Sequence, residues 1–193
     1  ATEPVETGRV DQGAGAGGRR CLATTGARVV SIRPWWGLFG AWLIAIHAHA
    51  DSGSRSNVFN DPFVQVTAGL PDCPVPDAPG VTAQEARELA HDRSQRGVSC
   101  WLAGRCRLAN AYLYDAEIIP RVQQALRYSG RFAGTSIWAA GERRIVWLQG
   151  CVASAEQAAE AEQLVRQIDD VEGVVNQLMT GNGGTPAYRV APR

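Results

Sequence analysis

The sequence predicts an α+β fold for residues 115–180, with elements in the order helix, strand, strand, helix, strand (αββαβ). Two segments with apolar residues at helical spacing flank a pair of strand-like runs. A further β-branched run follows at residues 171–179. The rest of the chain is expected to form a Cys-rich helical extension at residues 51–114 and disordered ends.

The first helix of this domain is expected to be capped by Asp115 or Ile119. Pro120 has no amide proton, so it is acceptable only near a helix start, where amide protons lack helical partners anyway. Gly130 is expected to end the helix. The apolar stripe of this helix consists of Ile118, Ile119, Val122, Ala125, Leu126 and Tyr128.

Residues 135–140 and 145–152 are expected to be the strands of a hairpin, joined by a turn at residues 141–144. Side chains alternate between the two faces of a strand, so Trp138 and Trp147 fall on the same face. That face also carries Ile145, Gln149 and Cys151. The opposite face is expected to pack under both helices and carries Ile137, Ala139, Val146, Leu148 and Val152.

The second helix is expected to begin at a capping box formed by Ser154 and Gln157. Residues 171–179 then form the final strand. The Gly- and Pro-rich residues 181–193 are expected to be a flexible tail. The core stripe of the second helix consists of Ala158, Ala161, Leu164, Val165 and Ile168.

The N-terminal part of the sequence indicates export. Residues 1–27 have no apolar period and are expected to be disordered; without an initiator Met, part of them is a candidate mis-called start. Residues 28–50 have the charged, apolar and small-x-small regions of a signal peptide, with cleavage expected after Ala50. The alternative, a transmembrane anchor, needs about 20 apolar residues, and the run at 35–46 is shorter. We therefore expect a periplasmic protein without a transmembrane span.

The cysteines agree with an oxidising compartment. Cys21 precedes the expected cleavage site, and four cysteines follow it: Cys73, Cys100, Cys106 and Cys151. Four cysteines form two disulfides in any of three pairings. The alternative is a zinc site, but zinc-binding cysteines are usually spaced more closely than Cys100 and Cys106, and only His91 remains as a histidine ligand. We expect no metal and no cofactor.

The extension is expected to contain a short strand at residues 63–66 and a Pro-rich turn region at 71–80. Thr82 and Glu85 form a capping box that predicts a helix running to about Arg96, where Gly97 stops it. Residues 100–106 are expected to be a compact loop.

Two motifs in the domain at residues 115–180 resemble those of the BON domain family. The first is V-x-L-x-G-x-V, which is formed by Val146, Leu148, Gly150 and Val152. The second includes Ile168, Val171, Val174, Asn176 and Leu178. Asp170 stands where the family usually has Gly, and Asp also tolerates left-handed backbone angles.

This resemblance to a single BON domain implies a fold with two helices on one face of a three-stranded sheet. It also implies a function, because BON domains occur mostly in bacterial periplasmic and outer-membrane proteins. The family is associated with phospholipid binding, with envelope maintenance and with envelope stress such as osmotic stress. Its members often supply an attachment module within larger proteins.

The sheet face without helices carries Trp138 and Trp147, and an exposed apolar patch of that size is unusual. One interpretation is that residues 63–114 fold over this face and that a disulfide from Cys151 holds them there. A local bridge between Cys100 and Cys106 leaves Cys73 as the partner of Cys151. The other interpretation is that this face binds a ligand or a membrane. We favour the first.

Arginines are the second candidate feature for binding. They lie on or after the first helix (Arg121, Arg127 and Arg131) and in the hairpin turn (Arg143 and Arg144). Arginine binds phosphate through a planar fork, so these residues beside Trp138 and Trp147 form a candidate lipid-headgroup site. The alternative is a solvated surface paired with Glu142, Glu156 or Glu160. The expected partner is an anionic phospholipid or another envelope protein.

Catalysis and nucleic-acid binding have little support in the sequence. His91 has no nucleophile near it in a motif, and the glycines at 181–184 open no helix. Asp169 and Asp170 are expected to solvate a turn. A formal net charge of zero and the lack of a basic stripe argue against nucleic acid. The sequence therefore predicts a non-enzymatic module that binds phospholipid or a membrane surface, or alternatively docks onto another envelope protein.

Overall fold

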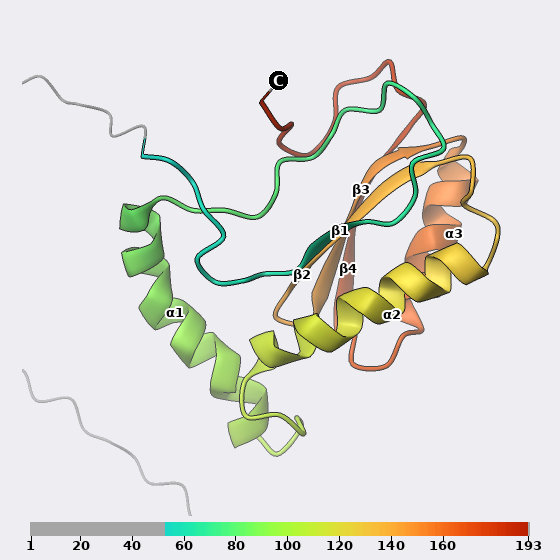
Figure 1. Cartoon of the computed structure of the whole chain (residues 1–193). Coiled ribbons are helices and arrows are strands. Elements are labelled where there is room, and N and C mark those ends of the chain that lie inside the picture. Colours follow the sequence, from blue (N-terminus) through green and yellow to red (C-terminus); the bar gives the residue numbers. More distant parts are fainter. Residues whose placement is uncertain (1–52, 193) are drawn as a thin grey trace, which may run out of the picture. The chain divides into compact units, whose positions relative to one another are not determined.

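The computed structural model describes residues 53–192, and the expected disordered stretch 1–27 and signal peptide 28–50 lie outside this range. Figure 1 shows the arrangement of the elements. The helices are α1 (Ala83–Leu102), the short 3-10 helix η1 (Ala111–Tyr114), α2 (Asp115–Tyr128) and α3 (Ala155–Arg166). The strands are β1 (Phe63–Gln65), β2 (Ser136–Glu142), β3 (Ile145–Val152) and β4 (Gly173–Thr180).

The sheet has four strands in the order β1-β2-β3-β4, which corrects the expected three-stranded sheet. The short strand predicted at 63–66 is present as β1, and it pairs antiparallel with β2, placing Gln65 opposite Trp138. Strands β2 and β3 form the predicted hairpin, and β4 lies parallel to β3 after the α3 crossover. The extension thus completes the sheet, because β1 covers the hydrogen-bonding groups at the edge of β2.

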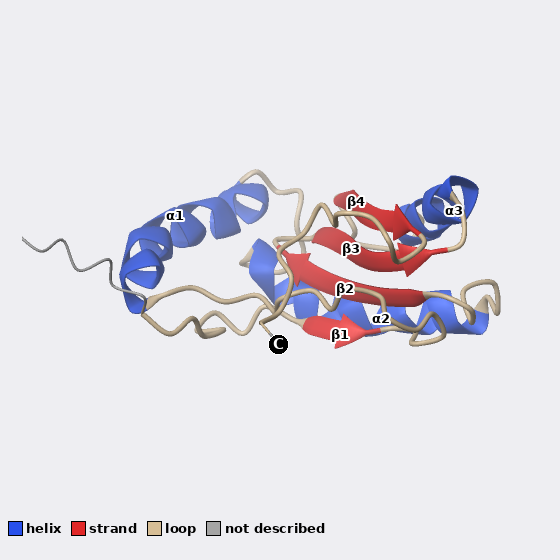
Figure 2. Ribbon diagram, turned by 90° about the horizontal axis from the view of Figure 1, so that it is seen from above, coloured by secondary structure: helices blue, strands red, loops and turns tan. Residues whose placement is uncertain are grey.

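Helices α2 and α3 pack on one face of this sheet (Figure 2). The buried core contains the predicted residues Ile118, Ile119, Val122, Leu126, Ile137, Ala139, Val146, Leu148, Val152, Ala161 and Val165. Tyr128 was expected in the stripe of α2, but it is 81% exposed. Two residues after buried Leu126, it is turned about 200° around the helix axis and faces away from the sheet.

Helix α1 begins at the predicted capping box, in which Thr82 and Glu85 each accept the other's backbone N–H. The expectation that Gly97 stops the helix is wrong, because α1 continues to Leu102 and Gly97 is buried within it. A Cβ at Gly97 would lie 2.4 Å from Oδ1 of Asn110. Gly97 therefore allows the close approach of the N-cap of η1 rather than ending α1.

Helix α2 follows η1 without a break, so neither Asp115 nor Ile119 caps it. Tyr114, at the junction, already has helical backbone angles. Pro120 consequently lies inside a continuous helical segment and is exposed to solvent. Asp115 is instead buried and points towards the hairpin turn.

The two disulfides join Cys73 to Cys151 and Cys100 to Cys106, with Cα–Cα distances of 5.9 and 5.4 Å. The Cys73–Cys151 bond holds the Pro-rich segment 70–79 over the sheet face opposite the helices. Ser136 at the start of β2 adds a hydrogen bond to the backbone oxygen of Leu70. Trp138 is 7% exposed beneath this cover, and Trp147 is half-buried.

The C-terminal segment, predicted from sequence to be a loose tail, lies along the same cover. Pro76 and Val190 form an antiparallel bridge, and the hydroxyl of Tyr188 donates to the backbone oxygen of Pro74 at 2.7 Å. Helix α1, by contrast, packs against η1 to the side of the sheet (Figures 1 and 2). The interpretation that the extension covers this face is thus correct for segment 70–79, but not for α1.

Candidate functional site

The arginines predicted to bind a headgroup make internal contacts instead of forming one patch. Arg121 donates to Asp170 at 3.1 Å, and Arg131 forms an ion pair with Glu160. Nε of Arg127 donates to the backbone oxygen of Val66 at 2.7 Å, which fixes the end of β1 to α2. These three side chains extend from successive turns of α2 and the following loop towards three different partners.

Arg143 and Arg144 form the two-residue hairpin turn, and both have positive φ angles, 53° and 67°. Asp115 satisfies this turn, because its carboxylate accepts the backbone N–H of Arg143 at 2.6 Å and of Arg144 at 2.7 Å. Burial raises the pKa of Asp115 to about 6, although the two backbone hydrogen bonds oppose that shift.

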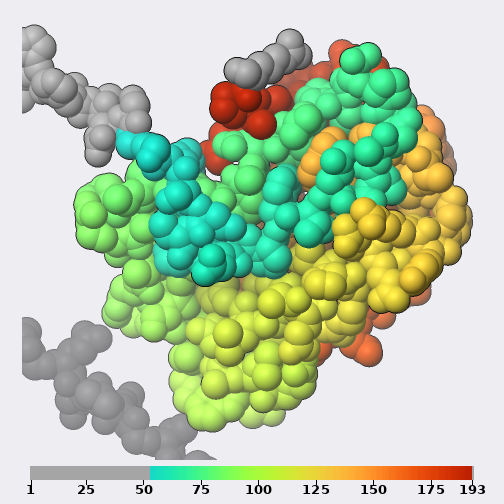
Figure 3. Space-filling view, viewed as in Figure 1, coloured from blue at the N-terminus to red at the C-terminus, as the bar shows by residue number. Residues whose placement is uncertain are grey.

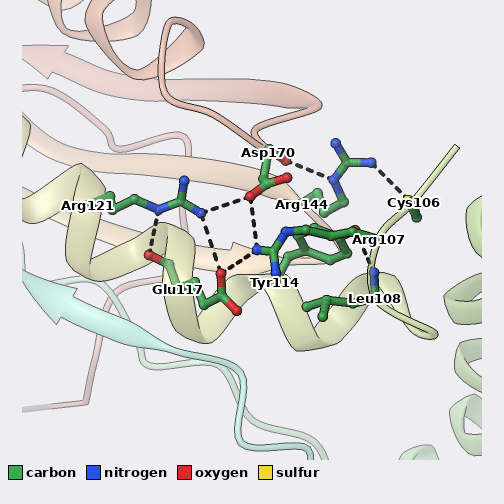
Figure 4. Close-up of polar contacts among 8 residues, drawn as sticks. All are labelled: Cys106, Arg107, Leu108, Tyr114, Glu117, Arg121, Arg144 and Asp170. Atoms are coloured by element: carbon green, nitrogen blue, oxygen red, sulfur yellow. Dashed lines mark hydrogen bonds and ion pairs between the residues drawn. The ribbon is translucent and has the colours of Figure 1, made fainter.

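The guanidinium of Arg144 lies at the junction between the extension and the domain (Figure 4). It donates to the backbone oxygen of Asp170 at 2.8 Å and to Sγ of Cys106 at 3.2 Å. It also lies 4.9 Å from the ring centroid of Tyr114. Arg144 therefore contacts one sulfur of the Cys100–Cys106 disulfide.

Asp170, which replaces the usual family glycine, has a φ of 72° and so keeps the left-handed backbone that glycine favours. Its side chain accepts hydrogen bonds from Arg107 and Arg121, and Arg107 also pairs with Glu117 (Figure 4). The departure from the motif thus adds ion pairs between the extension and the domain.

Other residues of the two motifs have structural roles. Gly150 has a φ of 120°, and a Cβ there would lie 2.0 Å from the backbone oxygen of Ser136. Asn176 donates to the backbone oxygen of Ala158 at 3.0 Å and accepts from the backbone N–H of Leu178. Val146, Leu148, Val152 and Val174 are buried in the core, and Val171 and Leu178 pack against it.

The most exposed apolar group near this junction lies in the disulfide loop, defined here as residues 100–106. The expectation that this whole segment is a loop is only partly correct, because residues 100–102 form the end of α1. Trp101 is 49% and Leu102 is 72% exposed, and Arg105 is also exposed. The loop is closed by the disulfide and by a hydrogen bond from the N–H of Arg105 to the oxygen of Cys100 at 2.9 Å. Nothing lies within 4 Å of a Cβ placed at Gly104, so the loop tip meets open space.

Sequence reasoning missed Trp101 and Leu102 as candidate binding residues. The available signal was an adjacent Trp-Leu pair between two cysteines only a few residues apart, where a closed loop is too small to bury both side chains. Of the arginines and tryptophans predicted to bind a ligand, Arg144 is the one that donates a hydrogen bond to this loop within residues 53–192. Trp138 and Trp147 lie instead on the covered sheet face.

The described residues contain neither a candidate metal site nor a candidate membrane-spanning helix. Within residues 53–192, His, Cys, Asp and Glu side chains form no group of three or more that is placed to hold a metal ion. In the same range, no helix has both the length and the apolar character needed to cross a membrane.

Comparison with known proteins identifies the domain. The family model described as "BON domain" matches residues 114–182, a range that includes α2, the hairpin, α3, β4 and both motifs. No curated protein and no solved structure matched the chain. The chain therefore carries a BON domain, and the protein is a BON domain-containing protein.

Proposed function

We propose that this protein is a non-enzymatic module of the bacterial periplasm that binds phospholipid at a membrane surface, as part of envelope maintenance. BON domains are known for membrane- and phospholipid-related roles in the cell envelope and are generally not enzymes. The two disulfides fit an exported protein. The observation that carries the proposal is the exposed disulfide loop with Trp101 and Leu102.

The chemistry of this loop suits the interface between water and lipid. Trp is favoured at the headgroup level because its ring is apolar and its N–H is polar. Leu102 offers apolar surface at about 0.8 kcal/mol per buried CH₂ group. The positive charge of Arg105, beside them, contributes about 1 kcal/mol of attraction to an anionic surface. One small loop therefore supports weak, reversible binding.

The base of the loop carries arginines that are paired with carboxylates. Arg107 pairs with Glu117 and Asp170, and Arg144 lies 3.8 Å from Glu172. Arg143 occupies the neighbouring hairpin turn. In this proposal, Arg105 contacts headgroups, while Arg121, Arg127, Arg131 and Arg144 serve the fold through the contacts described above.

Vesicle co-sedimentation at low salt tests the proposal. The protein is expected to sediment with vesicles that contain phosphatidylglycerol, and the double variant Trp101→Ser/Leu102→Ser is expected to stay in solution. Tyr128→Ser is the matched control, because it removes an exposed aromatic side chain at the far end of α2. The proposal fails if the unmodified protein does not sediment, or if the double variant sediments equally well.

A second candidate function is docking onto another envelope protein through the same loop. The loop is held by a disulfide, so its Trp and Leu lose little conformational entropy on entering a protein pocket. A formal net charge of zero gives no overall attraction to anionic lipid. A photo-cross-linking residue at Leu102 distinguishes the two functions: a specific protein adduct in cells supports docking, and lipid adducts support membrane binding.

A further inference from the structure

A pocket of about 190 Å³ lies on the sheet face opposite α2 and α3. Its floor is formed by the end of β2 and by Trp147 and Gln149 of β3. Asp61 forms one wall just before β1, and Asp77 and Arg189 come from the Pro-rich cover and the C-terminal segment. Figure 3 shows residues of the extension (cyan to green) beside the C-terminal segment (red). The pocket exists only because these distant segments meet over the sheet.

The carboxylates of this pocket outnumber the cations that neutralise them. Both oxygens of Asp61 accept hydrogen bonds from Arg93, at 2.5 and 3.1 Å, and one oxygen of Glu142 accepts from the same guanidinium at 3.2 Å. Asp77 pairs with Arg189 at 2.5 Å. Three carboxylates therefore share two guanidinium groups.

Arg93 does not neutralise Glu142 alone, because other side chains also hold its guanidinium group. Its guanidinium lies 4.2 Å from the ring centroid of Phe59 and 3.9 Å from that of Tyr112. Its side chain is 12% exposed, and that of Glu142 is 45% exposed. Burial and the nearby Asp61 carboxylate raise the pKa of Glu142, while Arg93, Arg143 and Arg96 lower it. Glu142 is thus the carboxylate with capacity for another cation.

Trp147 supplies the second element of recognition. The face of an indole ring attracts cations, and it does so most strongly where water is partly excluded. A half-buried Trp beside under-neutralised carboxylates disfavours anions and favours a cation that also has apolar surface. The volume of the pocket limits the size of the ligand. A cavity of about 150 Å³ in another protein accommodates benzene, so this pocket has room for a molecule of about that size.

We infer that this pocket binds a small organic ammonium ion, with its charge between Glu142 and the Trp147 ring. The ligand is either a free amine such as choline or ethanolamine, or the ammonium end of a phospholipid headgroup. The two sources present the same chemistry to the pocket. This site is separate from the disulfide loop and goes beyond the function proposed for it.

NMR of the Trp indole N–H signals tests the inference, with the mature chain and its disulfides intact. Trp147→Phe assigns the Trp147 signal. Titration with choline chloride or ethanolamine is expected to shift this signal in a saturable way, in the millimolar range typical of very small ligands. Sodium chloride at equal ionic strength is expected to leave it unchanged. No saturable shift with either amine, and none with phosphatidylcholine micelles, would overturn the inference.

Variants separate binding from general charge effects. Glu142→Gln removes the charge while Asp61 still holds Arg93, and it is expected to weaken amine binding at least tenfold. Glu117→Gln is the matched control, because this exposed carboxylate lies in the separate Arg107 cluster. Equal affinity in Glu142→Gln and the unmodified protein contradicts the inference. A shift with phosphatidylcholine micelles but not with free amines supports the site and identifies the headgroup as its source.

Discussion

The carboxylate of Asp170 accepts a hydrogen bond from Arg107 at 3.2 Å, which joins the Cys-rich extension to the turn before β4. Arg121 of α2 donates to the same oxygen at 3.1 Å. The residue that departs from the family motif is therefore one of those that link the domain to its extension. Besides this contact, the extension and the BON domain are joined by the β1–β2 pairing, by the Cys73–Cys151 disulfide and by hydrogen bonds such as that of Arg144 with Cys106.

Two substitutions at Asp170 are expected to distinguish the stabilising effect of its ion pairs from the cost of its left-handed backbone. Asp170→Ala loses both arginine contacts and keeps a side chain at a φ of 72°, so we expect it to lower the free energy of unfolding by about 1–2 kcal/mol. Asp170→Gly loses the same contacts but relieves the left-handed strain, and it should be more stable than the Ala variant by about 1 kcal/mol. Urea denaturation measures both; equal stabilities would show that the backbone is not strained.

The burial of Asp115 predicts a pH dependence of stability. Its pKa is raised from 3.8 to about 6, so the folded state holds this proton more tightly than the unfolded state. The stabilising contribution is complete below pH 3.8 and is lost as the pH rises through about 6. The pKa difference of about 2 units corresponds to about 3 kcal/mol at most.

Asp115→Asn is the matched variant for this prediction. It has no titrating carboxyl group, so its free energy of unfolding should not show the decline of the unmodified protein between pH 4 and 7. It also replaces one of the two oxygens that accept from Arg143 and Arg144 with an amide, so it should be less stable at every pH. Denaturant unfolding at several pH values checks this, and parallel curves for the two proteins would contradict it.

Gly150 is expected to tolerate no side chain. Gly150→Ala places a Cβ 2.0 Å from a backbone oxygen at a φ of 120°, so we expect a loss of about 3–5 kcal/mol. Gly130→Ala is the control, because its φ is 68° but nothing lies within 4 Å of a Cβ. It should lose only about 1 kcal/mol. Thermal unfolding followed by circular dichroism compares the two, and similar losses would mean that the clash is relieved by a backbone shift.

Local patterns predicted the elements of the domain because their causes lie close together in the chain. The alternation in β3 correctly separated Leu148 from Trp147, and the capping box placed the start of α1 at Ala83. Gly97 was misinterpreted because its reason is Asn110, which approaches it from another element. A glycine in sequence looks the same whether it ends a helix or makes room for a neighbour.

The candidate site was less predictable, since it depends on contacts between distant residues. An arginine in a helix pattern does not reveal its partner, and Arg127 pairs with the backbone of β1 rather than with any acid. The pocket beside Trp147 needs Asp61, Asp77 and Arg189, which are brought together only by β1, the Cys73–Cys151 disulfide and the C-terminal segment. The exposure of Trp101 follows from the packing of α1 beside η1, away from the sheet.

Removal of each disulfide is expected to have a different effect. The Cys73–Cys151 bond spans 78 residues, so Cys73→Ala/Cys151→Ala should cost about 4 kcal/mol through loop-closure entropy. It should also release the cover from Trp138, and therefore shift its fluorescence to longer wavelength. Cys100→Ala/Cys106→Ala opens a span of only 6 residues and should cost about 2 kcal/mol without that shift.

Guanidinium denaturation and Trp fluorescence of the two double variants check this difference. The Cys100–Cys106 variant should still bind amines at the pocket, because none of the pocket residues lies in the disulfide loop. It should bind vesicles less well, since the last turn of α1, which carries Trp101 and Leu102, loses its covalent link and can fray before these side chains enter the interface. If it instead lost amine binding and kept vesicle binding, the assignment of the two surfaces would be reversed.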